Sequence, residues 1–530
     1  MSVENDARSV PPRPALRRTT AAIRNVAAAY AGTVAEGVVF LLLTPFLVRE
    51  LGLAQYGLWS LVVVSVDWAQ LFDFGLREAT MKFAAAHQAL AEMPELRRVA
   101  DSALFAYTII GSVVFTAVAF FAAFALPHFV VDPETLGDAR AVMLILGASA
   151  AISFPAGLAG TLLEGLSRFE ILNLVRAGHA ALRLGLCVLA LQFDLGVVGV
   201  AAAELLARLG LHVARWTFLV RVYRDFVPRP VPHRGDLKRL FGFGMWNSVR
   251  QGGDVAMARM YEPLLAMFAG LPSIGAFYAG RRLAAMPGEA IVPMSGVLFP
   301  LSSELDAGRR EKALRQMLLH TTKFAAAVSL PLSMVLAFGA TPIQTNWLGN
   351  RAPEAEVVLK IFAVGFLFVA AAMPSESILL GLGRVRLLAL TGLAHVLVTL
   401  AAGVPLTRYW GAPGLALASL IAVIFTQFLV YLPAAARRCG VHPWDFFAKA
   451  ILPTWIAGAP VAALMALFAR RIEGGGLASL AAWCGGGFLV YASIFWRVGL
   501  DADERAFLRR HVRRLFLPDS RVDDWGDGTP

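Results

Sequence analysis

The chain has 530 residues, of which 58% are hydrophobic and only 16% are charged, and its mean hydropathy is +0.64. Soluble domains carry about 25% charged residues, so this composition excludes an ordinary soluble protein. A large soluble helical protein would need polar faces on its helices, and most of the apolar runs here have none. The net charge of +11 is spread over alternate loops rather than gathered in one patch, which argues against nucleic acid as a partner.

Apolar runs long enough to cross a membrane follow one another along most of the chain. A helix of about 20 apolar residues spans roughly 30 Å of hydrocarbon. The sequence therefore predicts an all-α polytopic membrane protein with about fourteen transmembrane helices. The expected spans are 26–48, 57–83, 101–126, 141–163, 171–192, 196–219, 240–268, 274–300, 318–340, 356–380, 387–407, 412–433, 451–469 and 477–496.

The loops between these spans alternate in charge, and the basic loops indicate the cytoplasmic side. These loops are 82–98, 221–239, 309–315 and 437–449. Both termini are therefore expected in the cytoplasm, although Arg470 and Arg471 fall on the outer side. The three cysteines are scattered without metal-ligand spacing, and no nucleotide-binding motif occurs, so we expect no cofactor and no metal.

A helix–loop–helix corner occurs twice in the chain. PFLVRELGLAQYG at 45–57 returns as PLLAMFAGLPSIG at 263–275, so that one proline, two leucines and two glycines meet their equivalents at one constant offset. Two later corners repeat in the same order. GLSR at 165–168 returns at 381–384 as GLGR, and GVVG at 196–199 returns at 411–414 as GAPG. Three repeated corners indicate an internal duplication.

The duplication defines the expected domains. We expect a lobe of six helices at 25–220 and a second at 240–435, joined by a cytoplasmic linker at 221–239. Six is an even number, so the two copies share their orientation in the membrane. Two extra helices at 436–498 lie outside the repeat. The cytoplasmic tails are expected at 1–24 and 499–530.

The order of several segments resembles a known family. These are LTPFLVRELGLAQYGLWSL, FDFGLREATMKFAAAH and LLEGLSRFEILN in the first half, and YEPLLAMFAGLPSIGAFYAGRRLAAMP followed by VLFPLSSEL in the second. Over about residues 20–435 the chain resembles the polysaccharide-transporter branch, the Wzx-like oligosaccharide flippases, of the multidrug/oligosaccharidyl-lipid/polysaccharide (MOP) flippase superfamily. The resemblance implies two lobes facing each other in a V, as in MATE transporters, with alternating access. It also implies the bacterial inner membrane and a lipid-linked glycan as cargo.

Charged residues inside the spans indicate where a polar path lies. Each costs about 2.5–3.5 kcal/mol at a helix centre on insertion scales, so it needs a partner or a watery cavity. Arg183 and Arg208 fall near the middle of the fifth and sixth spans. They either line a lumen, which we favour, or are neutralised by a Glu204–Arg208 pair between helices. Arg176 and Arg215 are expected to reach the cytoplasmic surface.

The seventh and eighth spans carry further charges. Arg250 can pair with Asp254, and Arg259 with Glu262, by helical spacing. Arg281 and Arg282 follow, with Glu289 on the face of Arg282. Arginine donates paired hydrogen bonds to phosphate oxygens and stays charged at any depth. The arginines expected to bind a diphosphate are Arg183, Arg208, Arg250, Arg259, Arg281 and Arg282.

Three acids are expected to couple transport to an ion. Asp254 is the equivalent of Glu36 at the offset of the first corner, and Glu262 precedes a proline as in the family's acidic-Pro pair. For Glu36, a role in helix packing is an equal alternative. Asp73 and Arg77 are expected to pair with each other, and Lys323 is expected to lie near the interface without a special role.

The leading hypothesis is a flippase for an undecaprenyl-diphosphate-linked oligosaccharide, driven by proton or sodium counterflow and working beside glycan polymerase machinery in the inner membrane. The main alternative is a proton- or sodium-coupled multidrug antiporter of the MATE type. A membrane glycosyltransferase would need long external loops with catalytic residues, and the first such loop covers only about 49–55. A membrane scaffold would not need charged helices. We therefore expect a transporter rather than an enzyme.

Overall fold

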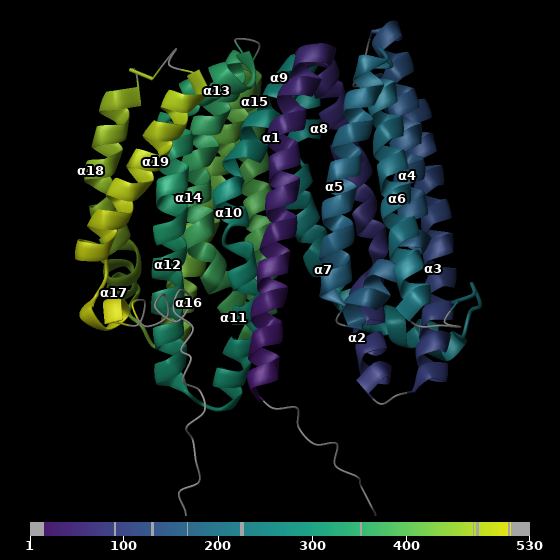
Figure 1. The fold of residues 1–530 in the computed structure, drawn as a ribbon, viewed down its shortest axis with the longest axis horizontal. Helices are drawn as coiled ribbons and strands as arrows, with labels where there is room; N and C mark the ends of the chain where they lie inside the picture. The colour runs from purple at the N-terminus through teal and green to yellow at the C-terminus, as the bar shows by residue number, and fades with distance from the viewer. Residues whose placement is uncertain are drawn as a thin grey trace, which may run out of the picture. The chain divides into compact units, whose positions relative to one another are not determined.

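The computed structural model describes residues 15–89, 92–128, 132–166, 168–222, 227–349, 352–469, 471–472, 476–506 and 509. Within these ranges some side chains, including those of Arg250 and Asp254, are outside the description. Every regular element of the described residues is a helix (Figure 1). The prediction of an all-α protein is confirmed.

The helices form two compact units, which we describe one at a time. The first unit contains Met1–Ala279 and Leu400–Leu415, and the second contains Gly280–Thr399 and Ala416–Pro530. These units follow from which helices contact each other in space, whereas the expected lobes follow from the repeated corners in the sequence. The boundaries of the lobes, the linker and the tails therefore stay predictions.

In the first unit, four long helices run side by side (Figure 1). α3 packs against α4, α4 against α6, and α6 against α5, while α1 contacts both α4 and α5. The helices of this unit are α1 (Ala15–Asp67), η1 (Trp68–Asp73), α2 (Leu76–Ala89), α3 (Met93–Phe120), η2 (Phe121–Ala125), η3 (Leu126–His128), α4 (Pro133–Gly165), α5 (Phe169–Gln192), α6 (Gly196–Val222), α7 (Arg234–Arg259), α8 (Tyr261–Phe268) and most of α9 (Leu271–Ala284).

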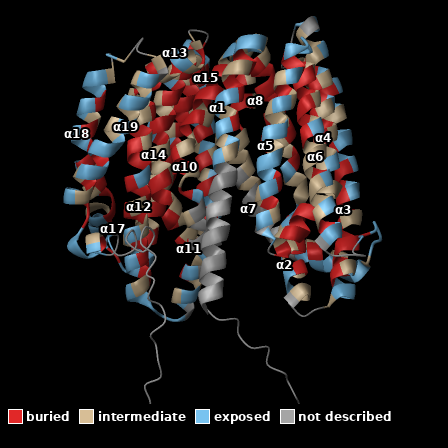
Figure 2. Cartoon of the chain, viewed as in Figure 1, coloured by how far each residue is buried: buried red, intermediate tan, exposed pale blue. Residues whose placement is uncertain are grey.

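In the second unit, α12 and α14 pack against each other, and α18 packs against α12. α19 contacts α12, α13 and α18, and its remaining surface is exposed and includes the apolar side chains of Phe488, Leu489 and Val490, as for a helix with one side toward lipid (Figure 2). The helices of this unit are α10 (Met286–Glu289), α11 (Val292–Ala307), α12 (Glu311–Phe338), α13 (Ala340–Trp347), α14 (Pro353–Gly381), most of α15 (Val385–Val423), η5 (Ile424–Tyr431), α16 (Leu432–Arg438), α17 (Pro443–Phe446), η6 (Phe447–Ile451), α18 (Leu452–Ala469), α19 (Gly476–Ile494) and η7 (Phe495–Gly499).

Ten helical stretches of the described residues are long and apolar enough to cross a membrane, so the chain is a multi-pass membrane protein. Two of them, Val34–Asp73 and Arg386–Arg438, contain parts of two expected spans each. The expected spans 240–268 and 274–300 are not among the ten. Polar residues lower the hydropathy of α7, and the following segment is divided into short helices. The count of fourteen stays a prediction.

The two copies of the first corner touch each other in the first unit. A methyl group added to Gly57 would collide with the carbonyl oxygen of Leu271, and one added to Gly275 would lie 2.8 Å from the carbonyl oxygen of Leu53. Leu53 and Leu271 are equivalent in the repeat, as are the two glycines. The contact is therefore reciprocal. Only residues without a side chain allow two backbones to approach this closely.

The second corner makes one contact that recurs in each unit. A methyl group added to Gly165 would lie 2.8 Å from the carbonyl oxygen of Met81, and one added to Gly381 would lie 2.7 Å from that of Phe299. Met81 and Phe299 are themselves equivalent at the offset of the first corner. The same backbone approach is thus made twice, as an internal duplication predicts.

Lys323 is buried and has a partner that the sequence does not predict, while its place near the membrane interface stays a prediction. Its Nζ donates to Oε2 of Glu504 over 2.6 Å, and both residues are buried. The backbone N–H of Asp501 donates to the same oxygen over 2.9 Å. The segment after α19 therefore folds back onto α12 and supplies the missing counter-charge, which spacing along one helix cannot reveal.

Replacing Gly57 with alanine tests the backbone contact between the corners. The added methyl group meets the backbone of Leu271, which cannot rotate away, so Gly57→Ala is expected to destabilise the protein by about 1–3 kcal/mol. Gly185→Ala in α5 is the matched control because nothing lies within 4 Å of its Cβ position. The melting temperatures of the purified variants in detergent measure the effect. Equal melting temperatures for the two variants would contradict the contact.

Candidate functional site

A cavity of about 810 Å³ lies within the first unit. It is enclosed by α1, η1, α2, α3, α4, α5 and α6, with single residues from α7 and α9. We name it the charged cavity because its lining contains five arginines and five carboxylates. These are Arg77, Arg176, Arg183, Arg208 and Arg215, with Asp67, Asp73, Glu78, Glu164 and Glu204.

The positive charges are concentrated on one wall. α5 and α6 contribute Arg176, Arg183, Arg208 and Arg215 to the lining, against the single carboxylate of Glu204. Residues four or seven apart share a face of a helix, and α5 packs against α6. The two arginine rows therefore lie side by side. We call this side of the cavity the basic wall.

The negative charges are concentrated on the other wall, formed by α1, η1, α2 and α4. It contributes Asp67, Asp73, Glu78 and Glu164 against the single arginine Arg77. We call it the acidic wall. The cavity thus presents opposite charges from different helices.

Glu204 is the centre of the basic wall. Its Oε2 lies 2.6 Å from Nε of Arg183, and its Oε1 accepts a hydrogen bond from Nε of Arg208 over 3.2 Å. Glu204 is only 5% exposed. One carboxylate faces two guanidinium groups, so the cluster keeps one uncompensated positive charge. The predicted Glu204–Arg208 pair exists, but it does not remove both arginines from the cavity.

Arg215 extends the basic wall beyond this cluster. Among the described residues it forms no ion pair, and its buried Nε has no hydrogen-bond partner. A methyl group added to Gly160 of α4 would lie 2.8 Å from Nη1 of Arg215, so the guanidinium lies close against that helix. The sequence predicts that Arg215 and Arg176 reach the cytoplasmic surface. Both line the cavity, where Arg176 is exposed and Arg215 is half-buried, and their reach to the cytoplasmic surface stays a prediction.

The acidic wall is held together by ion pairs between helices. Nη2 of Arg77 lies 2.7 and 2.8 Å from the two carboxylate oxygens of Glu164. The predicted side-chain pair of Arg77 with Asp73 is therefore wrong: from Arg77, Asp73 accepts the backbone N–H over 3.3 Å and not the guanidinium. α2 packs against α4, and this brings Glu164 next to the guanidinium of Arg77 although the two residues are far apart in the sequence.

Arg259 joins α7 to α1. Its Nη2 lies 2.9 Å from Oδ2 of Asp67, which lines the cavity, whereas Arg259 itself is not a lining residue. Helical spacing predicts a pair with Glu262, but α7 ends at Arg259 and Glu262 belongs to α8, where it is fully buried.

The remaining predicted site residues lie elsewhere. Glu36 is exposed and lies 3.4 Å from Nε of Arg176. Arg281 and Arg282 belong to the second unit, where Arg282 pairs with Glu289 as their spacing predicts. The side chains of Arg250 and Asp254 lie outside the described residues. The roles of these residues in binding and coupling stay predictions.

Of the acids on the opposite wall, the sequence analysis identified Asp73 but missed Asp67, Glu78 and Glu164. Asp67 interrupts the apolar run VVVSVDWAQ, and Glu164 interrupts GTLLEGL. A carboxylate within an apolar span is itself a signal of a polar cavity. Their partners are not predictable from spacing because they belong to other helices. As for metals, the described residues contain no group of three His, Cys, Asp or Glu side chains placed to hold an ion.

The charged cavity has no counterpart of the same chemistry in the second copy of the repeat. At the offsets of the second and third corners, uncharged residues replace five of its charged ones. Glu164, Arg183, Glu204, Arg208 and Arg215 correspond to Leu380, Thr399, Ser419, Val423 and Val430.

Comparison with known proteins agrees with this architecture. The sequence model of the family described as "Polysaccharide biosynthesis protein" matches residues 46–351. A protein of Shigella flexneri named "Putative O-antigen transporter" is 21% identical over 406 residues, which cover 75% of this chain and 93% of that protein.

Two solved structures share the fold. An inward-facing multidrug resistance MATE family transporter of the MOP superfamily has a TM-score of 0.65 at 16% identity, covering 77% of this chain and 94% of that one. The lipid II flippase MurJ in an inward closed conformation has a TM-score of 0.61 at 16% identity, covering 86% and 98%. The family match and the shared fold confirm the resemblance inferred from the corner motifs.

Replacing Glu204 with glutamine tests whether one carboxylate holds the basic wall together. Two arginines would then face each other without a counter-charge, so Glu204→Gln is expected to cost about 2–4 kcal/mol of stability. This is below the figure for a fully buried pair because Arg183 and Arg208 are 35% and 39% exposed.

Glu170→Gln is the control, because Glu170 pairs with Arg168 at the surface over 3.4 Å and should lose at most about 0.5 kcal/mol. Chemical unfolding of both variants in detergent micelles gives the comparison. If Glu204→Gln is as stable as the control, the cluster does not stabilise the wall.

Proposed function

The chain belongs to the family of polysaccharide biosynthesis proteins, and on that premise we propose that it is a flippase for an undecaprenyl-diphosphate-linked oligosaccharide. The cargo would be a repeat unit of O-antigen, capsule or exopolysaccharide. It would cross the bacterial inner membrane by alternating access. The fold of membrane transporters and the name of the Shigella flexneri relative support this proposal.

The basic wall is the observation that carries the proposal. A lipid diphosphate brings two or more negative charges into the membrane and needs donors that stay charged at depth. Arg183 and Arg208 share one carboxylate, and Arg215 has no ion pair among the described residues. Guanidinium groups bind phosphate oxygens in pairs of parallel hydrogen bonds. Arg183, Arg208 and Arg215 would therefore receive the head group, and Arg250, Arg259, Arg281 and Arg282 would act at other stages of translocation.

Carboxylates would couple this movement to an ion. The equivalent acids Glu36 and Asp254, together with Glu262, are proposed to bind a proton or sodium ion in turn. Glu36 already lies beside Arg176 of the basic wall, at 3.4 Å. Loading of that carboxylate by a cation would release the arginine, which links ion binding to the anion site.

A multidrug or cation antiporter is the second candidate, and the acidic wall favours it. Asp67, Asp73, Glu78 and Glu164 line the same cavity, and carboxylates attract organic cations. Three charged side chains of the acidic wall already form ion pairs: Glu164 and Arg77 pair with each other, and Asp67 pairs with Arg259. On the basic wall two arginines share Glu204, and Arg215 has no ion pair among the described residues; together with the family match, this is why we rank the flippase first.

The proposal includes a topology and a working context. Both termini would lie in the cytoplasm, and the two lobes at 25–220 and 240–435 would move about the cargo. Glycan polymerase machinery on the outer face would take up the product.

Arg215 supplies the direct test. Losing a charged hydrogen-bond donor costs about 1.5–3 kcal/mol, so Arg215→Gln is expected to slow glycan-lipid translocation about tenfold or more. Reconstituted vesicles loaded with the lipid-linked oligosaccharide measure the rate. Arg221→Gln, which changes an exposed arginine on the same helix, should keep the wild-type rate. Wild-type translocation by Arg215→Gln would contradict the proposed anion site, and transport of organic cations without glycan transport would favour the antiporter.

The coupling acids are tested separately. Glu36→Gln and Asp254→Asn remove the charge that a cation would neutralise, so translocation by each variant is expected to lose its response to an imposed proton or sodium gradient. The rate is measured with and without each gradient in the same vesicles. A gradient response equal to that of the wild type in both variants would exclude these acids as the coupling sites.

A further inference from the structure

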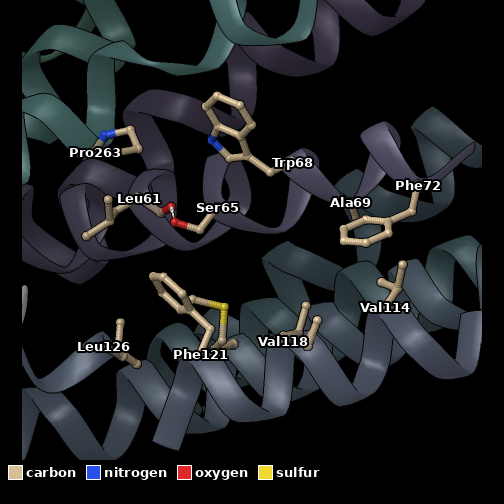
Figure 3. Close-up of a pocket in the computed structure, with 12 residues that line it drawn as sticks. Leu61, Ser65, Trp68, Ala69, Phe72, Val114, Val118, Phe121, Leu126 and Pro263 are labelled. Atoms are coloured by element: carbon tan, nitrogen blue, oxygen red, sulfur yellow. Dashed lines mark hydrogen bonds between the residues drawn. The ribbon is translucent and has the colours of Figure 1, made fainter. Parts of the chain in front are cut away.

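A second cavity, of about 350 Å³, adjoins the charged cavity in the first unit. In Figure 3, Leu61, Ser65 and Trp68 lie across this cavity from Val118 and Phe121. The hydroxyl of Ser65 donates to the carbonyl oxygen of Leu61 over 2.8 Å, so it offers little to a polar ligand. We name this cavity the apolar chamber. Its lining is Leu61, Ser65, Trp68, Ala69, Phe72, Val114, Ala117, Val118, Phe121, Leu126, Met143 and Pro263.

The chamber and the charged cavity lie on opposite faces of one helix. From the segment formed by α1 and η1, Leu61, Ser65 and Trp68 line the chamber, whereas Val63 and Asp67 line the charged cavity. At about 100° per residue these two sets point roughly 180° apart. This segment therefore forms a partition between a charged and an apolar space.

The two cavities adjoin at one small residue of this partition. Ala69 lines both cavities. α3 and α4 also pass from one cavity to the other along a single face. Tyr107 lines the charged cavity and Val114, seven residues later, lines the chamber; likewise Met143 lines the chamber and Leu146 the charged cavity. The two spaces are therefore neighbours along both helices.

On its other side the chamber meets a groove on the exposed face of α3. Ala117 and Phe121 line both, and the groove, of about 630 Å³, continues over Ser112, Thr116 and Phe120. The hydroxyls of Ser112 and Thr116 donate to carbonyl oxygens of their own helix, over 2.9 Å each. The groove therefore presents mainly apolar groups to a ligand.

The helix is deformed where the chamber meets the groove. Phe121–Ala125 forms a π-helical turn at the end of α3, and such turns occur frequently at functional sites. Phe120 and Phe124 are more than 60% exposed on this face, as expected where a membrane helix meets hydrocarbon. A path of decreasing polarity thus runs from the charged cavity through the chamber to the membrane side of α3.

We propose that the apolar chamber binds isoprene units of the polyprenyl chain near the diphosphate while the head group lies within the charged cavity. This inference rests on the proposed function, because it assigns the tail of the same cargo. An amphiphile with an anionic head needs a charged site, an adjoining apolar site and an exit to the bilayer, and these three occur here in that order. The remainder of the chain would leave along the groove on α3.

Photocrosslinking of the wild-type protein tests the location of the tail. The probe is a polyprenyl diphosphate with a diazirine on an isoprene unit next to the diphosphate, added to the full-length protein in lipid nanodiscs. Adducts are expected on Leu61–Phe72 and Val114–Leu126 and should disappear with excess unlabelled polyprenyl diphosphate. Adducts only on other helices would overturn the proposal. So would equal competition by phosphatidylglycerol, which would make the chamber a site for bulk lipid.

A matched pair of variants separates the tail site from the anion site. Val118→Trp fills the chamber, whereas Phe115→Trp adds similar bulk on the same helix at a position that lines none of the three cavities. Binding of polyprenyl diphosphate is expected to weaken about tenfold in Val118→Trp, because several methylene groups lose their burial. Binding of inorganic pyrophosphate should change less than about twofold.

The outcomes distinguish the two proposals. If the wild-type protein binds neither pyrophosphate nor polyprenyl diphosphate, the proposed function fails and the tail site fails with it. If the wild type binds both ligands and Val118→Trp binds polyprenyl diphosphate as tightly as Phe115→Trp does, only the tail site is overturned. Should Val118→Trp fail to fold, the crosslinking of the wild type still decides the question.

Discussion

One carboxylate shared by two guanidinium groups is the contact on which the charged cavity depends. Burying a charge in a membrane helix is costly unless an opposite charge lies close. Glu204 lies 2.6 Å from Arg183 and 3.2 Å from Arg208, so both arginines are held at depth by a single acid. A second acid would neutralise this cluster of Arg183, Glu204 and Arg208 completely. The shared acid stabilises the two arginines, and the remaining positive charge still attracts an anion.

The duplication supplies a scaffold, and the chemistry is added to one copy. The backbone contacts of Gly165 with Met81 and of Gly381 with Phe299 are equivalent, so both copies build the same corner. At the position of Glu204, however, the second copy has Ser419. A protein with identical charged halves would have to bury twice as many ions. Because the five charges of the cavity that the second copy replaces occur in one copy only, their cost of desolvation arises once. The second unit buries a different pair, Lys323 with Glu504.

Much of the fold was predictable because it depends on patterns along the chain. Apolar run length indicated membrane helices, repeated glycines indicated the duplication, and the positions of Arg183 and Arg208 near the middle of successive spans indicated a polar path. The ion pairs between helices were not predictable. Arg77 is four residues from Asp73, yet its side chain pairs with the far more distant Glu164. Spacing identifies partners on one helix, but the choice among helices depends on packing that a single sequence does not contain.

The pair of Lys323 and Glu504 has a consequence for biosynthesis. The two residues are 181 positions apart, and Glu504 comes after the final long helix. At roughly 5–20 residues per second, translation delivers the glutamate about 10–40 s after the lysine. Throughout that interval the ammonium group needs water or lipid head groups, because its buried position has no counter-charge yet. The ion pair that joins α12 to the segment after α19 can therefore form only once Glu504 has been synthesised.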